Sequence, residues 1–223
     1  MTRKKILDHY FGNYLIRINN AIYSLYNKQG IIIMDDQHRE NESDIIFSAE
    51  TISIPQIAFA IRYSSGIICL CITENLRKKL ELPMMVQNNT SKYQTGFTVT
   101  IEAAKGVTTG VSAKDRYTTI KTATAYNAKP TDLHRPGHVF PLRALSGGVL
   151  IRPGHTEATI DILKIAHKNP IGILCELTNS NGTMADIYDT INFAKKHNMI
   201  VVTVNDIKKY IMKHNIFLYK DII

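Results

Sequence analysis

Short apolar runs rich in β-branched residues recur along the chain, and this feature most constrains the fold. Runs of four to seven such residues are typical of strands buried inside a sheet. They cover residues 31–34, 44–49, 67–72, 171–177 and 199–204. Most of the segments between them have apolar residues at helical spacing. This alternation predicts an α+β fold, a three-layer α/β sandwich built around a mixed, twisted sheet.

Helix boundaries follow from capping residues and apolar spacing. Ile18, Ala21 and Leu25 recur at helical spacing before Gly30, which suits a helix stop. Ser112 begins a capping box. Other helices are expected after Ser53, around 74–81, and at 112–126, 156–167, 183–197 and 205–214. Further strands are expected at 97–103, 139–142 and 148–151, whereas 83–96 and 127–138 look irregular.

A length of 223 residues is enough for one sizeable hydrophobic core. No repeat and no stretch rich in glycine, serine or proline divides the sequence, so we expect residues 1–223 to form a single domain. No segment approaches the roughly 20 apolar residues that span a bilayer. The N-terminus lacks the apolar run and cleavage site of a secretory signal. A soluble, cytoplasmic protein with no membrane contact is therefore expected.

Three cysteines and a net charge of +8 raise two alternatives. Cys69 and Cys71 could bind zinc, but no second Cys or His pair stands at zinc spacing, and all three cysteines lie in apolar runs. The positive charge could favour nucleic acid. The lysines and arginines are dispersed, however, and no aromatic residues alternate with them, so we expect no nucleic-acid partner.

The acidic loop 35–44, DDQHRENESD, joins two expected strands. Its five carboxylates in ten residues repel one another, so a folded loop of this composition favours bound cations. Magnesium prefers oxygen ligands and often uses one or two carboxylates together with water and substrate. A solvated acidic turn is the alternative interpretation of this segment alone.

Two Pro-Gly-His turns also contain side chains suited to binding or catalysis. Arg152-Pro153-Gly154-His155-Thr156 precedes an expected helix, whose free N–H groups and dipole favour a phosphate that an arginine can grip. A neutral imidazole at His155 could ligate a metal. Arg135-Pro136-Gly137-His138 is a rigid turn that presents a histidine, the residue best suited to acid–base chemistry near neutral pH.

Two further segments complete the set. Glu176 closes an apolar strand, where a carboxylate is either a rim charge or a catalytic group. The segment 106–112, which includes Thr109, combines glycines and hydroxyls before a helix start, as phosphate sites do. Each segment alone has an ordinary structural explanation. Together they lie at strand or helix ends, where the sites of α/β sheets gather, and they favour an enzyme.

The same segments resemble the 3,4-dihydroxy-2-butanone 4-phosphate synthase family. DDQHRENESD is similar to the family's acidic loop, usually DDxxRENEGD. The resemblance runs from about Gly30 to Val204 through SGIICLCIT, LPMM, NNTS, TGFTVTIEA, GVTTGVSAKDR, DLHRPGHVFPLRA, GHTEATIDIL, GILCELTN and GTMA. It implies a magnesium-dependent conversion of D-ribulose 5-phosphate to L-3,4-dihydroxy-2-butanone 4-phosphate and formate, in riboflavin biosynthesis. It also implies a layered α+β fold and a homodimer with its sites near the subunit interface.

The resemblance implies roles for individual residues. Glu40 and His155 would ligate the metal, Mg²⁺ or Mn²⁺, with two ions per site. Glu176 would be the catalytic carboxylate and His138 the essential histidine. The expected substrate contacts are Asp35, Arg39, Glu40, Asp44, Thr109, Arg152, Pro153, Gly154, His155, Thr156 and Glu176, with Glu42 as a helper.

Two positions depart from the family pattern. Ser43 stands where glycine is usual, so a positive φ there would carry a steric cost. Pro153 lies inside the expected phosphate loop and removes one backbone donor. Neither replaces an expected ligand or catalytic group, so we expect activity. The rival enzyme class is another metal-dependent sugar-phosphate isomerase or lyase.

Overall fold

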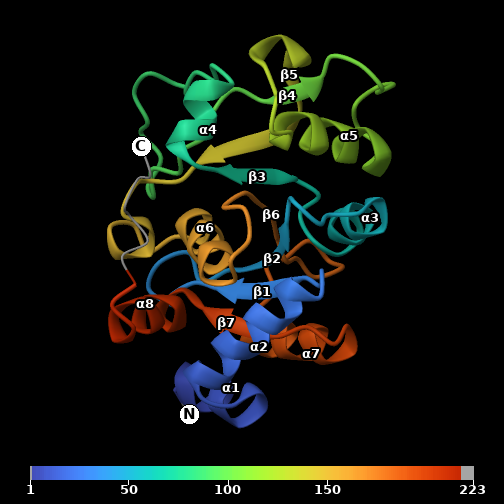
Figure 1. Ribbon diagram of the computed structural model, residues 1–223. Coiled ribbons are helices and arrows are strands. Elements are labelled where there is room, and N and C mark those ends of the chain that lie inside the picture. Colours follow the sequence, from blue (N-terminus) through green and yellow to red (C-terminus); the bar gives the residue numbers. More distant parts are fainter. Residues whose placement is uncertain (1, 217–223) are drawn as a thin grey trace.

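A single mixed sheet organises the protein. The computed structural model describes residues 2–216, and its seven strands follow the order β4-β5-β3-β6-β2-β1-β7. In Figure 1, β4 and β5 are at the top, and β3, β6, β2, β1 and β7 follow below them. The strands are β1 (Ile31–Met34), β2 (Ser43–Ser48), β3 (Cys69–Ile72), β4 (Ile101–Ala103), β5 (Leu133–Arg143), β6 (Gly172–Glu176) and β7 (Val201–Thr203). Every residue of β1, β2 and β3 is buried, which explains why β1 and β3 are continuous apolar runs in the sequence.

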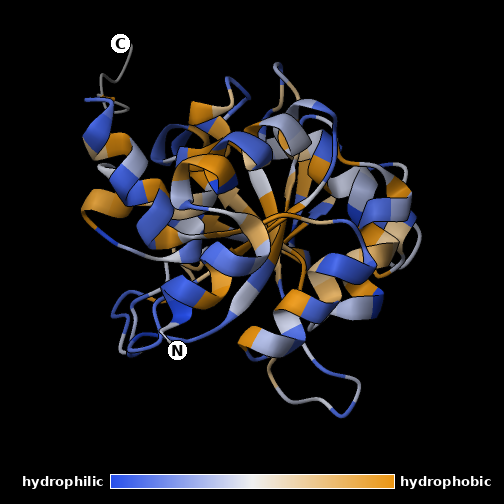
Figure 2. Cartoon of the chain, turned by 90° about the horizontal axis from the view of Figure 1, so that it is seen from below, coloured by the Kyte–Doolittle hydropathy of each residue, from blue (hydrophilic) through white to orange (hydrophobic). Residues whose placement is uncertain are grey.

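Helices cover both faces of the sheet. On one face α2, α6 and α8 pack on the strands through Ile18, Ile162 and Ile207, and on the other α3 and α5 pack through Ile57 and Ile120. Figure 2 shows the apolar strands at the centre, between helices with polar outer faces. The helices are α1 (Arg3–Phe11), α2 (Tyr14–Tyr26), α3 (Ile54–Tyr63), α4 (Glu74–Lys79), α5 (Ala113–Thr124), α6 (His155–Ile165), α7 (Ile187–Lys196) and α8 (Val204–Lys213). The predicted layered α+β fold is confirmed.

The strand register gathers several strand ends at one end of the sheet. β2 is antiparallel to both β1 and β6, with Met34 opposite Ser43 and Asp44 opposite Glu176. β3 is antiparallel to β6 and parallel to β5. The C-terminal ends of β1 and β6 therefore lie beside the N-terminal ends of β2 and β3. The acidic loop and Glu176 share this end of the sheet.

Several local predictions are confirmed. The side chain of Ser112 caps α5 by accepting a hydrogen bond from the backbone N–H of Asp115, and Ser53 forms a capping box with Gln56 at the start of α3. The three cysteines are free and buried in β3 and β6. No helix within residues 2–216 combines the length and apolarity needed to cross a bilayer.

Other local predictions are wrong, mainly where a glycine or proline interrupts the sequence pattern. Residues 148–151 are not a strand, because a left-handed Gly147 turns the chain into a short 3₁₀ helix. The strand expected at 97–103 is reduced to β4, at 101–103. By contrast, much of the irregular stretch expected at 127–138 belongs to the long strand β5. The prolines and glycine in β5 hid its extended conformation from the sequence pattern.

Two helix starts also differ from expectation. The N-cap of α7 is Asp186 rather than Thr183, and its carboxylate accepts hydrogen bonds from the first turn. Helix α1 was not predicted at all. Its stability comes from burial of Ile6 and Leu7 against β1, β7 and α7, which a local pattern of so many charged residues does not reveal.

Candidate active site

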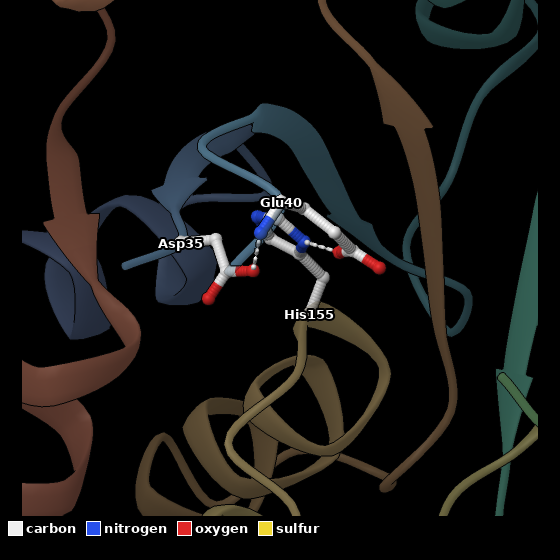
Figure 3. A group of neighbouring side chains, drawn as sticks. All are labelled: Asp35, Glu40 and His155. Atoms are coloured by element: carbon white, nitrogen blue, oxygen red, sulfur yellow. Dashed lines mark hydrogen bonds and ion pairs between the residues drawn. The ribbon is translucent and has the colours of Figure 1, made fainter. Parts of the chain in front are cut away.

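Three potential metal ligands converge at the end of the sheet where β1 meets α6. Asp35 follows β1, Glu40 lies in the acidic loop, and His155 is the first residue of α6. Figure 3 shows the three side chains pointing toward one another, and one ligand atom from each lies within 4.8 Å of the others. Nδ1 of His155 is 3.4 Å from Oε2 of Glu40. The structure thus brings Glu40 and His155 together across 115 positions of sequence, and adds Asp35.

The donor set fits a divalent cation. Nε2 of His155 and Oδ1 of Asp44 are buried, and neither has a hydrogen-bond partner among the described residues. Leaving such an atom unpaired costs about 1–3 kcal/mol, so these two atoms favour a bound partner. Two carboxylates with one imidazole suit Mn²⁺ and, through the oxygens, Mg²⁺.

The electrostatics of the group also favour a cation. Burial alone would lower the pKa of His155, but the carboxylates of Asp44 and Glu40 outweigh it and raise that pKa to about 9. Burial raises the pKa of Asp44, and the nearby Glu176 adds to the rise. Burial likewise raises the pKa of Glu42, with Glu40 contributing. Negative charge is therefore concentrated here, at an energetic cost that a positive ion would reduce.

The acidic loop is held in shape by its own residues. The guanidinium of Arg39 forms ion pairs of 2.5 Å with both Asp35 and Glu40. Ser43 lies in extended backbone in β2, and its hydroxyl is 2.9 Å from that of Thr190. Ser43 is not among the residues with positive φ, so the steric cost considered for serine at this position does not arise.

The start of α6 gathers two arginines. The N-cap Gly154 carries no side chain, and a Cβ there would overlap the guanidinium of Arg152 and lie 3.0 Å from that of Arg39. Thr156 is buried in the first turn, while Pro153 is exposed. Free backbone N–H groups and two guanidinium groups at one helix start make a suitable phosphate cradle.

The segment 84–97 closes over these arginines through Tyr93, a residue that the sequence analysis missed. The hydroxyl of Tyr93 donates to the carbonyl of Arg39, whose guanidinium lies 4.8 Å from the centre of the tyrosine ring. Arg152 donates to the carbonyl of Tyr93 at 3.0 Å and to the hydroxyl of Thr95 at 3.1 Å. Together with residues 143–152, the segment lines a cavity of about 580 Å³. Its polar, irregular sequence was the only signal of this position.

Glu176 lies beside the proposed metal group. It faces Asp44 across the β2–β6 pair. The hydroxyl of Ser65 donates to Oε2 of Glu176 at 2.6 Å, and the backbone N–H of Ser65 donates to the Glu176 carbonyl at 2.7 Å. Ser65, which the sequence analysis did not single out, therefore orients the carboxylate.

His138 and Thr109 lie elsewhere on the same end of the sheet. His138 projects from β5, and β3 separates β5 from β6, so the backbones of His138 and Glu176 are about 10 Å apart at ordinary strand spacing. Thr109 is exposed in the loop between β4 and α5. Within residues 2–216, no hydrogen bond or ion pair joins either residue to Glu40, His155 or Glu176.

Comparison with known proteins identifies the family. A family model described as 3,4-dihydroxy-2-butanone 4-phosphate synthase matches residues 19–210. The chain belongs to this synthase family. The 3,4-dihydroxy-2-butanone 4-phosphate synthase of Citrobacter koseri is 61% identical over 204 residues, which cover 92% of this chain and 94% of that protein. The synthase of Escherichia coli is 60% identical over 204 residues, which again cover 92% of this chain and 94% of that protein. The chain is therefore an enzyme of riboflavin biosynthesis.

Solved structures of 3,4-dihydroxy-2-butanone 4-phosphate synthases share the fold. One, in complex with two magnesium ions, has a TM-score of 0.85 at 35% identity and covers 89% of this chain and 97% of its own. Another, from Candida albicans, has a TM-score of 0.80 at 40% identity, and the match covers 87% of this chain and 96% of that one. The predicted family membership is thus confirmed.

Proposed function

We propose that this synthase, as a single domain over residues 1–223, converts D-ribulose 5-phosphate into L-3,4-dihydroxy-2-butanone 4-phosphate and formate with the help of Mg²⁺ or Mn²⁺. The observation that carries the proposal is the convergence of Glu40, His155 and Asp35 beside the start of α6. A cation group adjoining a phosphate cradle suits a phosphorylated sugar that must lose a proton. The structure of a relative in complex with two magnesium ions supports this metal use, and we propose two ions per site.

Substrate binding begins at the phosphate. Arg152, Arg39 and the N-terminus of α6, including Thr156, would hold the phosphate, because these groups supply positive charge and hydrogen-bond donors in one place. The sugar would then extend over the acidic loop toward Glu176, near Asp44. Repulsion between this anionic loop and an anionic substrate is the reason that binding needs a cation as well as the arginines.

Proton transfer falls to Glu176 and His138. Loss of the C3 proton would give an enediol, followed by loss of the C1 hydroxyl as water, a skeletal shift, addition of water at C4 and expulsion of C4 as formate. A magnesium or manganese ion held by Glu40 and His155 would supply positive charge beside the substrate oxygens. Glu176, held by Ser65, and His138 would accept and return protons at successive steps.

We also propose that a second copy of the chain completes the site. Among residues 2–216, neither His138 nor Thr109 is joined by a hydrogen bond or ion pair to Glu40, His155 or Glu176, so both could serve the site of a second subunit. The apolar side chains of Ile67 and Val111, on segments that flank His138, are 46% and 50% exposed. A homodimer formed across this face would cover them and bring His138 of one subunit toward the metal group of the other.

The deciding experiment incubates the protein with ribulose 5-phosphate and Mg²⁺, with and without a chelator, and measures formate. Formate that appears only with free metal ions is the expected result. A different product would indicate another sugar-phosphate isomerase or lyase. No turnover, together with chelator-resistant binding of nucleic acid that weakens with salt, would favour the nucleic-acid alternative.

A further inference from the structure

We infer that Glu102 is the residue that positions His138 for proton transfer. This inference rests on the proposed function, because it takes His138 as one of the proton-transfer groups. Oε2 of Glu102 lies 2.8 Å from Nδ1 of His138. The side chain of Glu102 is only 14% exposed, whereas that of His138 is 49% exposed. The carboxylate is thus a shielded support for a histidine whose other side faces outward.

An irregularity in the β4–β5 pair creates this contact. Ile101 is opposite Val139, but the next residue, Glu102, is opposite His134. The β5 residues 135–138 therefore have no partners on β4 and form a bulge. Bulges commonly redirect side chains at functional sites. A Cβ at Gly137 would overlap the backbone of Ile101, so a glycine is needed for the bulge to lie this close to β4.

The loop 106–112 confines Glu102 from the other side. A Cβ at Gly110 would overlap the Glu102 carboxylate, and the φ of +84° at Gly110 also favours glycine. Buried Asp115 holds the loop in place, because its Oδ2 accepts hydrogen bonds from the Thr108 hydroxyl at 2.7 Å and from the Gly110 N–H at 3.1 Å. Glu102 therefore sits between a fixed loop and the imidazole of His138.

This arrangement has a specific chemical result. A carboxylate beside Nδ1 selects the tautomer that carries its hydrogen on Nδ1, which leaves the lone pair of Nε2 free to accept a proton. The same carboxylate stabilises the imidazolium that forms when Nε2 takes that proton. An exposed ion pair alone would contribute little. Here a bulge and two glycines enforce the contact, which favours a positioning role.

The test compares Glu102→Ala with the wild-type enzyme. We expect kcat to fall about 10- to 100-fold, toward the loss seen when an acid–base group is removed, with KM changed less than about 2-fold. Nitrogen NMR of His138 should show the hydrogen on Nδ1 in the wild type and a mixture of tautomers in the variant. Glu74→Ala serves as the matched control, because it breaks another carboxylate ion pair, with Arg77, outside the site.

A double variant separates positioning from a structural effect. In a His138→Ala background, Glu102→Ala should change kcat no further, because the group on which Glu102 acts is gone. An equal loss of kcat in both backgrounds would overturn the inference. If the alanine variant does not fold, Glu102→Gln keeps the side-chain volume, and its amide can donate to Nδ1 and reverse the tautomer, so kcat should still fall.

The catalytic role of His138 and the positioning role of Glu102 can be tested separately. Wild-type turnover by His138→Ala would remove the catalytic role proposed for His138. The NMR measurement would still test Glu102, because unchanged nitrogen signals of His138 in Glu102→Ala would overturn the positioning role whatever the activity.

Discussion

At Glu40, burial opposes ionisation of the carboxylate, whereas two neighbouring side chains favour it. Its carboxylate is bound by the Arg39 guanidinium at 2.5 Å and lies 3.4 Å from Nδ1 of His155. Although burial raises the pKa of Glu40, these two partners outweigh it and lower that pKa. The carboxylate is therefore ionised near neutral pH and available to a cation, while remaining at the edge of the core.

Replacing Glu40 by glutamine should separate metal use from folding. Glu40→Gln removes one charged ligand, so we expect metal-dependent formate production to fall about 10- to 100-fold or more. The free energy of unfolding should change by less than about 0.5–1 kcal/mol, because the loop side chain is outside the core. Glu81→Gln, an exposed carboxylate, is the control. Turnover at the wild-type rate would remove the metal role of Glu40.

The affinity for Mg²⁺ should depend on pH through His155. Its pKa is raised to about 9 in the cation-free protein, so the imidazole is protonated at pH 7. Only the neutral ring can ligate a metal, so binding must release that proton. Affinity should therefore increase from pH 7 to 9, by up to about tenfold per pH unit. Calorimetry in buffers of different ionisation enthalpy measures the released proton, and a pH-independent affinity would contradict this ligand assignment.

At the scale of elements, one buried arginine connects three helices. Arg17 of α2 is 1% exposed and binds the carboxylate of Asp206, in the first turn of α8, through two hydrogen bonds of 2.9 Å. It also binds Asp8 of α1 at 2.7 Å and the carbonyl of Gly12 at 2.5 Å. This interaction fixes the helices that cover the β1–β7 side of the sheet.

Arg17→Met should destabilise the fold without altering the chemistry. The substitution leaves Asp206 buried without its cation, which costs about 3–5 kcal/mol of unfolding free energy. Urea denaturation measures this loss, and kcat of the folded enzyme should stay at the wild-type value. Asp8→Asn is the control, because Asp8 is 31% exposed and its loss should cost far less. A change below about 1 kcal/mol for Arg17→Met would contradict the connecting role.

The sequence predicted those elements whose local pattern agrees with their burial. Apolar runs correctly located β1, β2, β3, β6 and β7, because strands covered on both faces need no polar side. Only residues 139–142 of β5 were predicted as a strand, because the bulge at 135–138 breaks both the alternation and the pairing of the part that precedes them. α1 escaped because only its contacts with β1, β7 and α7 distinguish Ile6 and Leu7 from a polar surface segment.

The candidate site was predictable to a similar degree. Motifs located Glu40, His155, Arg152 and Glu176, because ligands and phosphate loops have recognisable residue types at short spacing. Tyr93 and Glu102 were missed, because their importance lies in contacts with residues 36–59 positions away, namely His138, Arg39 and Arg152.

At the scale of the whole molecule, the proposed dimer predicts complementation between inactive variants. Glu40→Gln and His138→Ala damage different halves of a shared site. After denaturation and joint refolding, mixed dimers would contain one intact site each, and activity should recover to about a quarter of the wild-type level. Refolding each variant alone is the control. No recovery in mixtures that contain mixed dimers would mean that each chain builds its own complete site.

The position of β6 in the sheet has a consequence for synthesis. β6 lies between β2 and β3, although residues 73–171 separate it from β3 in the chain. In a polypeptide growing on the ribosome, the edges of β2 and β3 therefore have no strand partner, and are prone to aggregation, until Gly172–Glu176 has emerged. Premature chain termination before that point should give an aggregation-prone, chaperone-dependent fragment, whereas emergence of β6 allows both strand edges to be covered.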